Sequence, residues 1–204
     1  IKFSDTLKIL KARGDAMQNA VPKGIGGMIA ILGTSIKKIE DIMYSNKDYC
    51  NFQIANDNSE GQIVVSGKLK DLDILTGILK SQNIRNIKLP VSAPFHCELM
   101  SNATKIMRDQ INKIEFYEGY NILMSNVTAD TVKDIPVIKN LLIRQIENRV
   151  RWRESVINMI DKGVKNFIEI GPGKVLSGLI KRIDKKVGVQ SINNEEDIKN
   201  LHIS

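Results

Sequence analysis

Hydrophobic residues recur along the chain with periods that alternate between those of helices and those of strands. The first apolar stripe occupies positions 3, 7, 10, 14, 17 and 21, and its spacings of four and three predict an amphipathic helix that ends before Pro22. Ser4 is the expected N-cap of this helix. Gly14 costs helix stability, so we expect another part of the backbone to approach closely there.

Residues 24–89 have the pattern of a small unit of their own, with a turn at 56–61. Apolar runs predict strands at 28–32, 50–55, 62–66 and 84–89, and helical spacing predicts helices at 35–45 and 69–79. The order βαββαβ is that of a ferredoxin-like arrangement, in which two helices cover one face of an antiparallel sheet. We therefore expect a ferredoxin-like subdomain over 24–89.

The pattern changes after Pro90, where helices alternate with strands. Helices are predicted at 98–112, 137–149, 153–162 and 174–184, and strands at 122–125, 164–170 and 187–192. The run 164–170 is almost continuously apolar, which predicts a strand covered on both faces. Alternating strands and helices favour a parallel α/β sheet. Residues 1–23 and 90–204 are thus expected to form one large α/β domain, into which 24–89 is inserted.

Charge and composition narrow the classes of partner. The net charge of +7 favours an acidic partner or a lysine-rich solvated surface. The lysines are dispersed and aromatic residues make up only 5%, so we expect no nucleic-acid partner. No apolar run is long enough to span a bilayer and no leader pattern opens the chain, so we expect a cytoplasmic protein without a membrane partner. Two cysteines and two histidines predict neither disulfides nor a metal site, and no cofactor is expected.

Two side chains are candidates for chemistry. His96 follows a predicted strand and two prolines and precedes a predicted helix, a position that suits a general base, although a structural histidine at a helix start is the alternative. Arg13 flanks the apolar stripe of the first helix and could bind a carboxylate, although a surface arginine is the alternative. The turn 171–174 is not a P-loop, because Val175 stands where Ser or Thr is needed.

Seven segments in order resemble the malonyl-CoA:acyl-carrier-protein transacylase family. They are Ala12-Arg-Gly14, Gly26-Gly-Met-Ile-Ala30, Ala55-Asn-Asp-Asn-Ser-Glu-Gly-Gln62, Val91-Ser-Ala-Pro-Phe-His96, Ser125-Asn-Val127, Leu142-Ile-Arg-Gln145 and Glu169-Ile-Gly-Pro-Gly-Lys-Val-Leu176. The resemblance covers nearly the whole chain. It implies an α/β fold in which a hydrolase-like parallel-sheet domain, incomplete here, carries the ferredoxin-like insert.

The resemblance also implies roles for individual residues. His96 matches the family's catalytic base, the backbone carbonyl of Gln145 orients it, and Arg13 binds the malonyl carboxylate, so His96 and Arg13 must face one cleft. The implied substrate-binding residues are Met17, Phe95, Asn56, Asn58 and Arg85, the last three contacting the coenzyme A or carrier-protein arm. The implied partners are malonyl-CoA and acyl carrier protein. A Phe95→Ser change is expected to relax selection against methylmalonyl groups.

One element of the family pattern is absent from the 204 residues. The family's nucleophilic serine lies in a Gly-His-Ser-x-Gly turn, and no G-x-S-x-G occurs between Ile1 and Ser204. We expect the serine upstream, so that this chain is inactive alone and its uncovered apolar faces associate with a complementary N-terminal fragment. Two alternatives are a non-catalytic carrier-protein or coenzyme A binding module and, more distantly, a nucleic-acid binder whose strands carry Phe52 as the single aromatic candidate.

Overall fold

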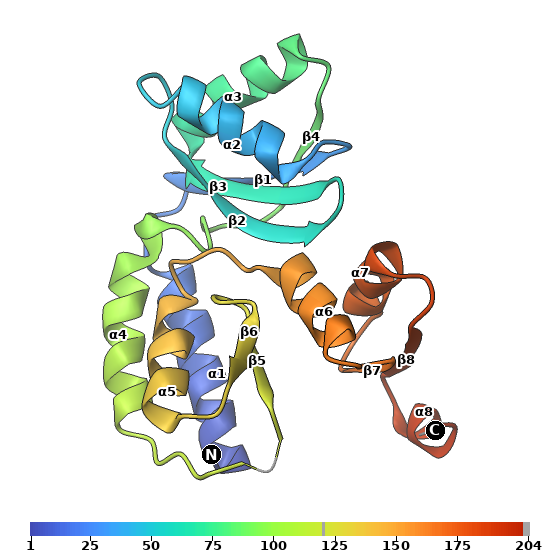
Figure 1. Cartoon of the computed structure of the whole chain (residues 1–204). Helices are drawn as coiled ribbons and strands as arrows, with labels where there is room; N and C mark the ends of the chain where they lie inside the picture. Colours follow the sequence, from blue (N-terminus) through green and yellow to red (C-terminus); the bar gives the residue numbers. More distant parts are fainter. Residues whose placement is uncertain (120, 202–204) are drawn as a thin grey trace.

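The computed structural model describes residues 1–119 and 121–201, so His202 lies outside the described part (Figure 1). The described residues form one four-stranded antiparallel sheet, one antiparallel strand pair and one parallel strand pair, with helices around them. The chain therefore has a mixed α/β fold. Among the described residues, no helix combines the length and apolar character needed to cross a membrane.

The four-stranded sheet belongs to the unit between residues 24 and 89. Its elements are β1 (Gly26–Leu32), α2 (Ile36–Ser45), β2 (Phe52–Ser59), β3 (Gln62–Lys68), α3 (Leu69–Ser81) and β4 (Arg85–Lys88). The strand order is β2-β3-β1-β4, and α2 and α3 lie together on one face of the sheet (Figure 1). Ile31, Ile39, Val65 and Leu75 are fully buried between sheet and helices. The chain order of the six elements is the one expected from the sequence.

Strand β2 runs further than its apolar residues indicate. The sequence predicted a turn at 56–61, but Asn56, Asp57 and Asn58 continue the strand up to Ser59. Pairing with β3 on one side and a bridge to Val150 on the other gives these polar residues backbone hydrogen-bond partners. These partners satisfy the backbone N–H and C=O groups whatever the side chains are, so a polar segment can continue the strand. The prediction of a turn at these three residues was therefore wrong.

Three helices form a second core below the sheet. They are α1 (Phe3–Gln18), α4 (Ser101–Asn112) and α5 (Ile135–Arg144), and buried residues from all three meet in one cluster. Two predictions for α1 are wrong. Lys2 is the N-cap residue, because the helix already begins at Phe3, and Ser4 lies inside the first turn. Gly14 faces open space rather than a close backbone.

The segment between α4 and α6 (Trp152–Asp161) departs most from the predicted pattern. Strand β5 (Leu123–Ser125) pairs antiparallel with β6 (Asp130–Val132), a short strand that its polar sequence did not predict, instead of joining a parallel sheet. Helix α5 ends at Arg144 instead of continuing to 149. Residues 145–148 form a turn, held by the bond from the Asn148 N–H to the Arg144 carbonyl at 3.0 Å.

The C-terminal part contains α6 (Trp152–Asp161), β7 (Asn166–Ile170), α7 (Val175–Ile183), β8 (Gly188–Ile192) and α8 (Glu195–Lys199). Strands β7 and β8 are parallel neighbours, as their alternation with α7 predicted. The prediction that β7 is covered on both faces is wrong for the described chain, because Ile168 is 39% and Ile170 80% exposed. The uncovered side chains form an apolar surface on this small sheet.

Candidate functional site

A cavity of about 500 Å³ lies where the unit of residues 24–89 meets the helices below it. Arg13 reaches it from α1, Asn56 from β2, His96 from the loop before the short helix Glu98–Met100, Asn126 from the β5–β6 turn and Gln145 from the end of α5. Arg13 and His96 thus border one cavity although 82 intervening residues separate them in the chain. The rest of the wall is largely apolar, with Ile9, Leu10, Ile111, Phe116, Leu142 and Ile146.

The ring of His96 is oriented by a backbone carbonyl. Its Nδ1 lies 2.8 Å from the carbonyl oxygen of Gln145. Because that oxygen can only accept, a neutral imidazole here carries its proton on Nδ1 and leaves the lone pair of Nε2 unbonded. The pKa of His96 is lowered, first by burial and then by the charge of Arg13, while the bond to Gln145 opposes the change. The imidazole is therefore neutral near pH 7 and able to accept a proton.

The backbone at His96 is strained and is held from several sides. His96 has a φ of 59°, a left-handed conformation that is uncommon for a residue with a side chain. The hydroxyl of Ser66 donates to the Phe95 carbonyl at 2.6 Å, and the thiol of Cys97 donates to the Pro94 carbonyl at 3.1 Å. Gly26 at the start of β1 leaves room for the Pro94 ring, which any Cβ would overlap. This strained position is fixed by contacts from β1 and β3.

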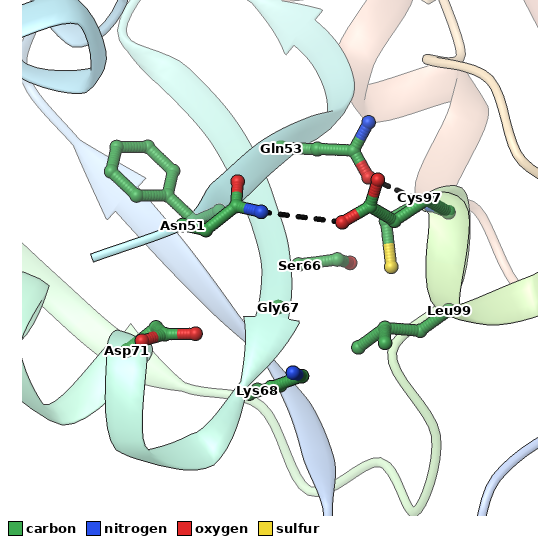
Figure 2. Close-up of a pocket in the computed structure, with 10 residues that line it drawn as sticks. Asn51, Gln53, Ser66, Gly67, Lys68, Asp71, Cys97 and Leu99 are labelled. Atoms are coloured by element: carbon green, nitrogen blue, oxygen red, sulfur yellow. Dashed lines mark hydrogen bonds between the residues drawn. The ribbon is translucent and has the colours of Figure 1, made fainter. Parts of the chain in front are cut away.

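A second set of bonds ties the residues after His96 to β2. A small cavity of about 50 Å³ lies between the β2–β3 pair and the segment 97–99, and its lining residues are drawn in Figure 2. Across it, the Asn51 side chain donates to the Glu98 carboxylate at 3.3 Å, and the Glu98 N–H donates to the side chain of Gln53 at 2.7 Å (Figure 2). The small size of this cavity and its bonded walls indicate a structural junction, not a ligand site.

Arg13 is a half-buried cation without a partner among the described residues. Its guanidinium makes no hydrogen bond or ion pair with any other described residue, and burial lowers its pKa. A partly desolvated charge is costly unless it is paired, and a guanidinium matches a carboxylate in a two-bond geometry. The cavity therefore favours a ligand with an anionic group at the Arg13 end.

The described residues that line this cavity include no serine and no cysteine. Thr6 brings a hydroxyl, but it donates to the Lys2 carbonyl at 3.1 Å. Cys97 follows His96 directly, yet its thiol is buried, and burial raises its pKa to about 11. Because the thiolate is the reactive form, Cys97 is not a nucleophile near neutral pH. The cavity thus offers a base and an anion-binding group but no activated nucleophile from the described residues.

The other residues singled out from the sequence differ in whether they line the cavity. Asn56 lines it, whereas Asn58 and Arg85, on β2 and β4, do not. Met17 is buried in the core cluster of α1, α4 and α5, and Phe95 packs against that cluster and against the lower face of the sheet. Neither side chain is among the described residues that line the cavity, and the substrate-binding roles of Met17 and Phe95 stay predictions.

Asn126 was missed as a site residue. It belongs to the segment 125–127 that carried part of the resemblance, but a lone asparagine in a predicted loop gives no periodic signal. The β5–β6 hairpin brings it to the cavity, and its carbonyl accepts the Arg151 N–H at 2.9 Å. Only the tertiary fold identifies this residue.

Three further features bear on ligands. Among residues 1–119 and 121–201, no group of three or more His, Cys, Asp or Glu side chains could hold a metal ion. The turn 171–174 is not arranged for phosphate, because the Glu169 carboxylate already accepts the N–H groups of Leu176 and Ser177 at the start of α7, at 3.0 and 2.8 Å. His96 also borders a second cavity of about 260 Å³, whose charged residues are Glu40, Glu147 and Arg149.

The chain resembles known proteins in both sequence and structure. No protein-family model matches the chain. The malonyl CoA-acyl carrier protein transacylase of Staphylococcus aureus (strain MRSA252) is 40% identical over 201 residues, which is 98% of this chain and 65% of that protein. The crystal structure of malonyl CoA-acyl carrier protein transacylase from Clostridium perfringens ATCC 13124 matches with a TM-score of 0.93 at 40% identity, over 98% of this chain and 63% of that one.

Over nearly its whole length, this chain is similar to malonyl CoA-acyl carrier protein transacylases. The relatives are acyltransferases by name, and the chain spans about 65% of the length of the S. aureus protein. Another similar structure is a malonyl-transacylase in complex with a type II polyketide acyl-carrier protein, with a TM-score of 0.92 at 31% identity over 98% of this chain and 65% of that one. The transacylase resemblance read from the sequence is thus confirmed.

Proposed function

We propose that this chain supplies the general base and the carboxylate-binding arginine for transfer of a malonyl group from malonyl-CoA to acyl carrier protein. One observation supports this most: His96 and the unpartnered Arg13 border a single, largely apolar cavity. No cofactor is needed for such a transfer. The proposal includes the finer architecture, in which residues 24–89 are a ferredoxin-like subdomain and residues 1–23 with 90–204 are part of a hydrolase-like domain.

In the proposed reaction, Nε2 of His96 accepts the proton of a serine hydroxyl as the serine oxygen attacks the thioester carbonyl. The carbon–sulfur bond then breaks, and the imidazolium returns the proton to the departing coenzyme A thiolate. The same steps in reverse pass the malonyl group from the serine to the thiol of the carrier protein. Two easier displacements thus replace one difficult transfer. The Gln145 carbonyl keeps the proton on Nδ1 and stabilises the imidazolium that forms.

The serine of this mechanism is proposed to come from a segment that the 204 residues do not contain. They have no G-x-S-x-G sequence, and the described wall of the cavity has neither serine nor cysteine. The chain alone is accordingly proposed to be inactive. Its uncovered apolar side chains, such as Phe3 on α1 and Ile170 on β7, are proposed to contact that complementary segment.

Arg13 is proposed to select malonyl over acetyl groups. A malonyl carboxylate would pair with the guanidinium, whereas an acetyl group would leave a desolvated charge unpaired. Sites that lose a polar partner in this way discriminate by roughly 10⁴-fold. Asn56 and Asn126 are proposed to bind polar groups of the thioester arm, since both side chains reach the same cavity.

The test is covalent labelling with radiolabelled malonyl-CoA. The chain is mixed with the segment of the same protein that carries a G-x-S-x-G sequence, and protein-bound label is counted. Label should appear in the mixture and be absent from the chain alone. It should fall by at least about 10²-fold in His96→Ala, the usual range for loss of a general base. Lys11→Gln, an exposed change on the same helix as Arg13, is the control and should leave the label unchanged.

The second candidate function is non-catalytic binding of coenzyme A or of the carrier protein. It is favoured by the absence of a nucleophile among the described residues of the cavity wall. In that case malonyl-CoA would bind reversibly and the mixture would acquire no covalent label. Equal label in His96→Ala and in the unchanged chain would contradict the proposed role of His96.

A further inference from the structure

A buried carboxylate next to the cavity is paired with an arginine from a distant part of the chain. Asp57 on β2 is 1% exposed. Arg153 on α6 donates from Nε to both carboxylate oxygens at 3.1 Å and from Nη2 to Oδ2 at 2.9 Å. A carboxylate buried this deeply requires a partner, and the paired geometry is the strong one. The pair thus joins the four-stranded sheet to the C-terminal part of the molecule.

A short backbone bridge lies beside this ion pair. The Val150 N–H donates to the Ala55 carbonyl at 2.7 Å, and the Asp57 N–H donates to the Val150 carbonyl at 3.0 Å. Asn56 lies between the two bonded residues, and side chains alternate along a strand. In agreement with that alternation, Asn56 lines the cavity while Asp57 pairs with Arg153.

The bridged segment continues to the carbonyl that orients His96. From Val150 the chain runs back through a tight turn to Gln145, and Gln145, Ile146 and Val150 all line the cavity. Gln145 accepts the Nδ1 proton of His96 at 2.8 Å. One run of six residues, 145–150, therefore carries both a cavity wall and the partner of the imidazole. Its far end is fixed against β2 next to the ion pair.

We propose that Asp57 and Arg153 are positioning residues that hold the segment 145–150 against β2 and thereby set the orientation of His96 and the place of Asn56 in the cavity. The inference rests on the proposed function only in treating His96 as the base. Neither residue touches the cavity, so each acts through the bridge.

Buried ion pairs are better suited to specifying a geometry than to adding stability, since desolvation offsets much of their attraction. Another ion pair, at the C-terminal end of α6, offers a matched comparison. Lys162 and Asp130 are 3.3 Å apart with side chains 50% and 63% exposed, and they join α6 to the β5–β6 hairpin. A surface pair of this kind contributes little, and neither of its residues takes part in the bonds of the bridge.

The test uses the whole 204-residue chain and two readouts that need neither a nucleophile nor a thioester. The first is the pH titration of the His96 ring by NMR, with His202→Gln to assign the two histidine signals. The second is hydrogen exchange of the Val150 amide, which is bonded to Ala55. The variants are Asp57→Asn and Arg153→Lys, and the control is Lys162→Gln. Arg153→Lys retains the charge but not the two-bond geometry.

In both test variants the His96 pKa should rise toward the ordinary histidine value, because burial is the largest cause of its lowering. Arg13 is the charged residue that shifts this pKa, and neither Asp57 nor Arg153 does so directly, which makes the shift a report of displacement. Exchange at Val150 should become at least about tenfold faster, as expected when a local opening becomes easier. The Lys162→Gln control should match the unchanged chain in both readouts.

A fall in melting temperature with unchanged His96 titration and unchanged Val150 exchange would overturn the proposal and leave the pair a structural one. Equal changes in Lys162→Gln would also overturn it. If Asp57→Asn does not fold, Arg153→Lys decides the outcome. If the positioning proposal fails in these two readouts, the proposal of malonyl transfer still stands. If covalent labelling fails, the prediction for the His96 titration and the Val150 exchange still stands.

Discussion

The unit of residues 24–89 and the chain around it differ in how completely their elements are covered. The first has a closed core, in which Ile31 and Leu75 are fully buried under two helices. In the second, the parallel pair β7–β8 leaves Ile170 exposed, and α1 leaves Phe3 exposed. The first unit is continuous in sequence, and its four strands pair with one another in a single sheet. The parallel pair β7–β8 is different, because parallel strands normally require cover on both faces. The site lies where the two regions meet, so its geometry depends on both.

The largest expected contrast is in stability. Leu75→Ala removes a fully buried side chain from the closed core and should lower the free energy of unfolding by about 2–5 kcal/mol. Ile170→Ala, at an 80% exposed position on β7, should change it by about 0.5 kcal/mol or less. Urea unfolding followed by circular dichroism measures both. Similar losses at the two positions would show that β7 is covered in solution.

Protection of backbone amides from hydrogen exchange should also be higher in residues 24–89 than in the chain around them. Amides of β1, which pairs with β3 on one side and β4 on the other, should exchange slowly. Amides of β7, which among the described residues pairs with β8 only, should exchange much faster. Addition of the segment that carries the nucleophile should slow exchange in β7 and leave β1 unchanged. Unchanged β7 exchange would contradict the proposed contact.

The sequence predicted the elements of residues 24–89 better than those of the chain around them, for a physical reason. Periodicity reports which residues of one element face a core, so the six elements of 24–89 could be read in order. It does not report partners from distant segments, which is why the extension of β2 through Asn56 and the exposure of Ile170 were missed. The capping box of α8, formed by Asn194 and Asp197, was present in the sequence but lacked an apolar stripe.

The site was predictable only as far as the family resemblance extended. Arg13 and His96 share a cavity as the resemblance required, and Gln145 is bonded to the imidazole. The cavity wall formed by Asn126 and Val150 depends on a hairpin and a bridge that no local pattern encodes. The roles of all these residues stay predictions until they are measured.

A smaller effect is expected on the pH dependence of malonyl transfer, measured with the chain and the segment that carries the nucleophile together. His96 must be neutral to accept a proton, and its pKa lies below the ordinary value of about 6.5 because of burial and the charge of Arg13. Activity should therefore fall only as the pH drops through that lowered pKa. Arg13→Gln removes one cause of the lowering, so its acid limb should move to higher pH. A shift to lower pH, found in initial rates from pH 5 to 8, would contradict this arrangement.

The smallest effect is expected from Phe95→Ser. Phe95 packs against two core clusters and does not line the cavity, so any change in selection must come from repacking around His96. The prediction remains a modest increase in methylmalonyl transfer relative to malonyl transfer, measured in competition for the mutant and the parent, both as complete enzymes. An unchanged ratio would assign Phe95 to the core alone.

The central claim is that one cavity presents the imidazole of His96 and the guanidinium of Arg13 to the same small ligand. NMR titration of a non-hydrolysable malonyl-CoA analogue into the labelled chain tests it most directly. The His96 ring and Arg13 Nε signals should move together with a single Kd, and the acetyl analogue should leave the Arg13 signal in place. Movement of only one of the two signals, or two different Kd values, would contradict the account.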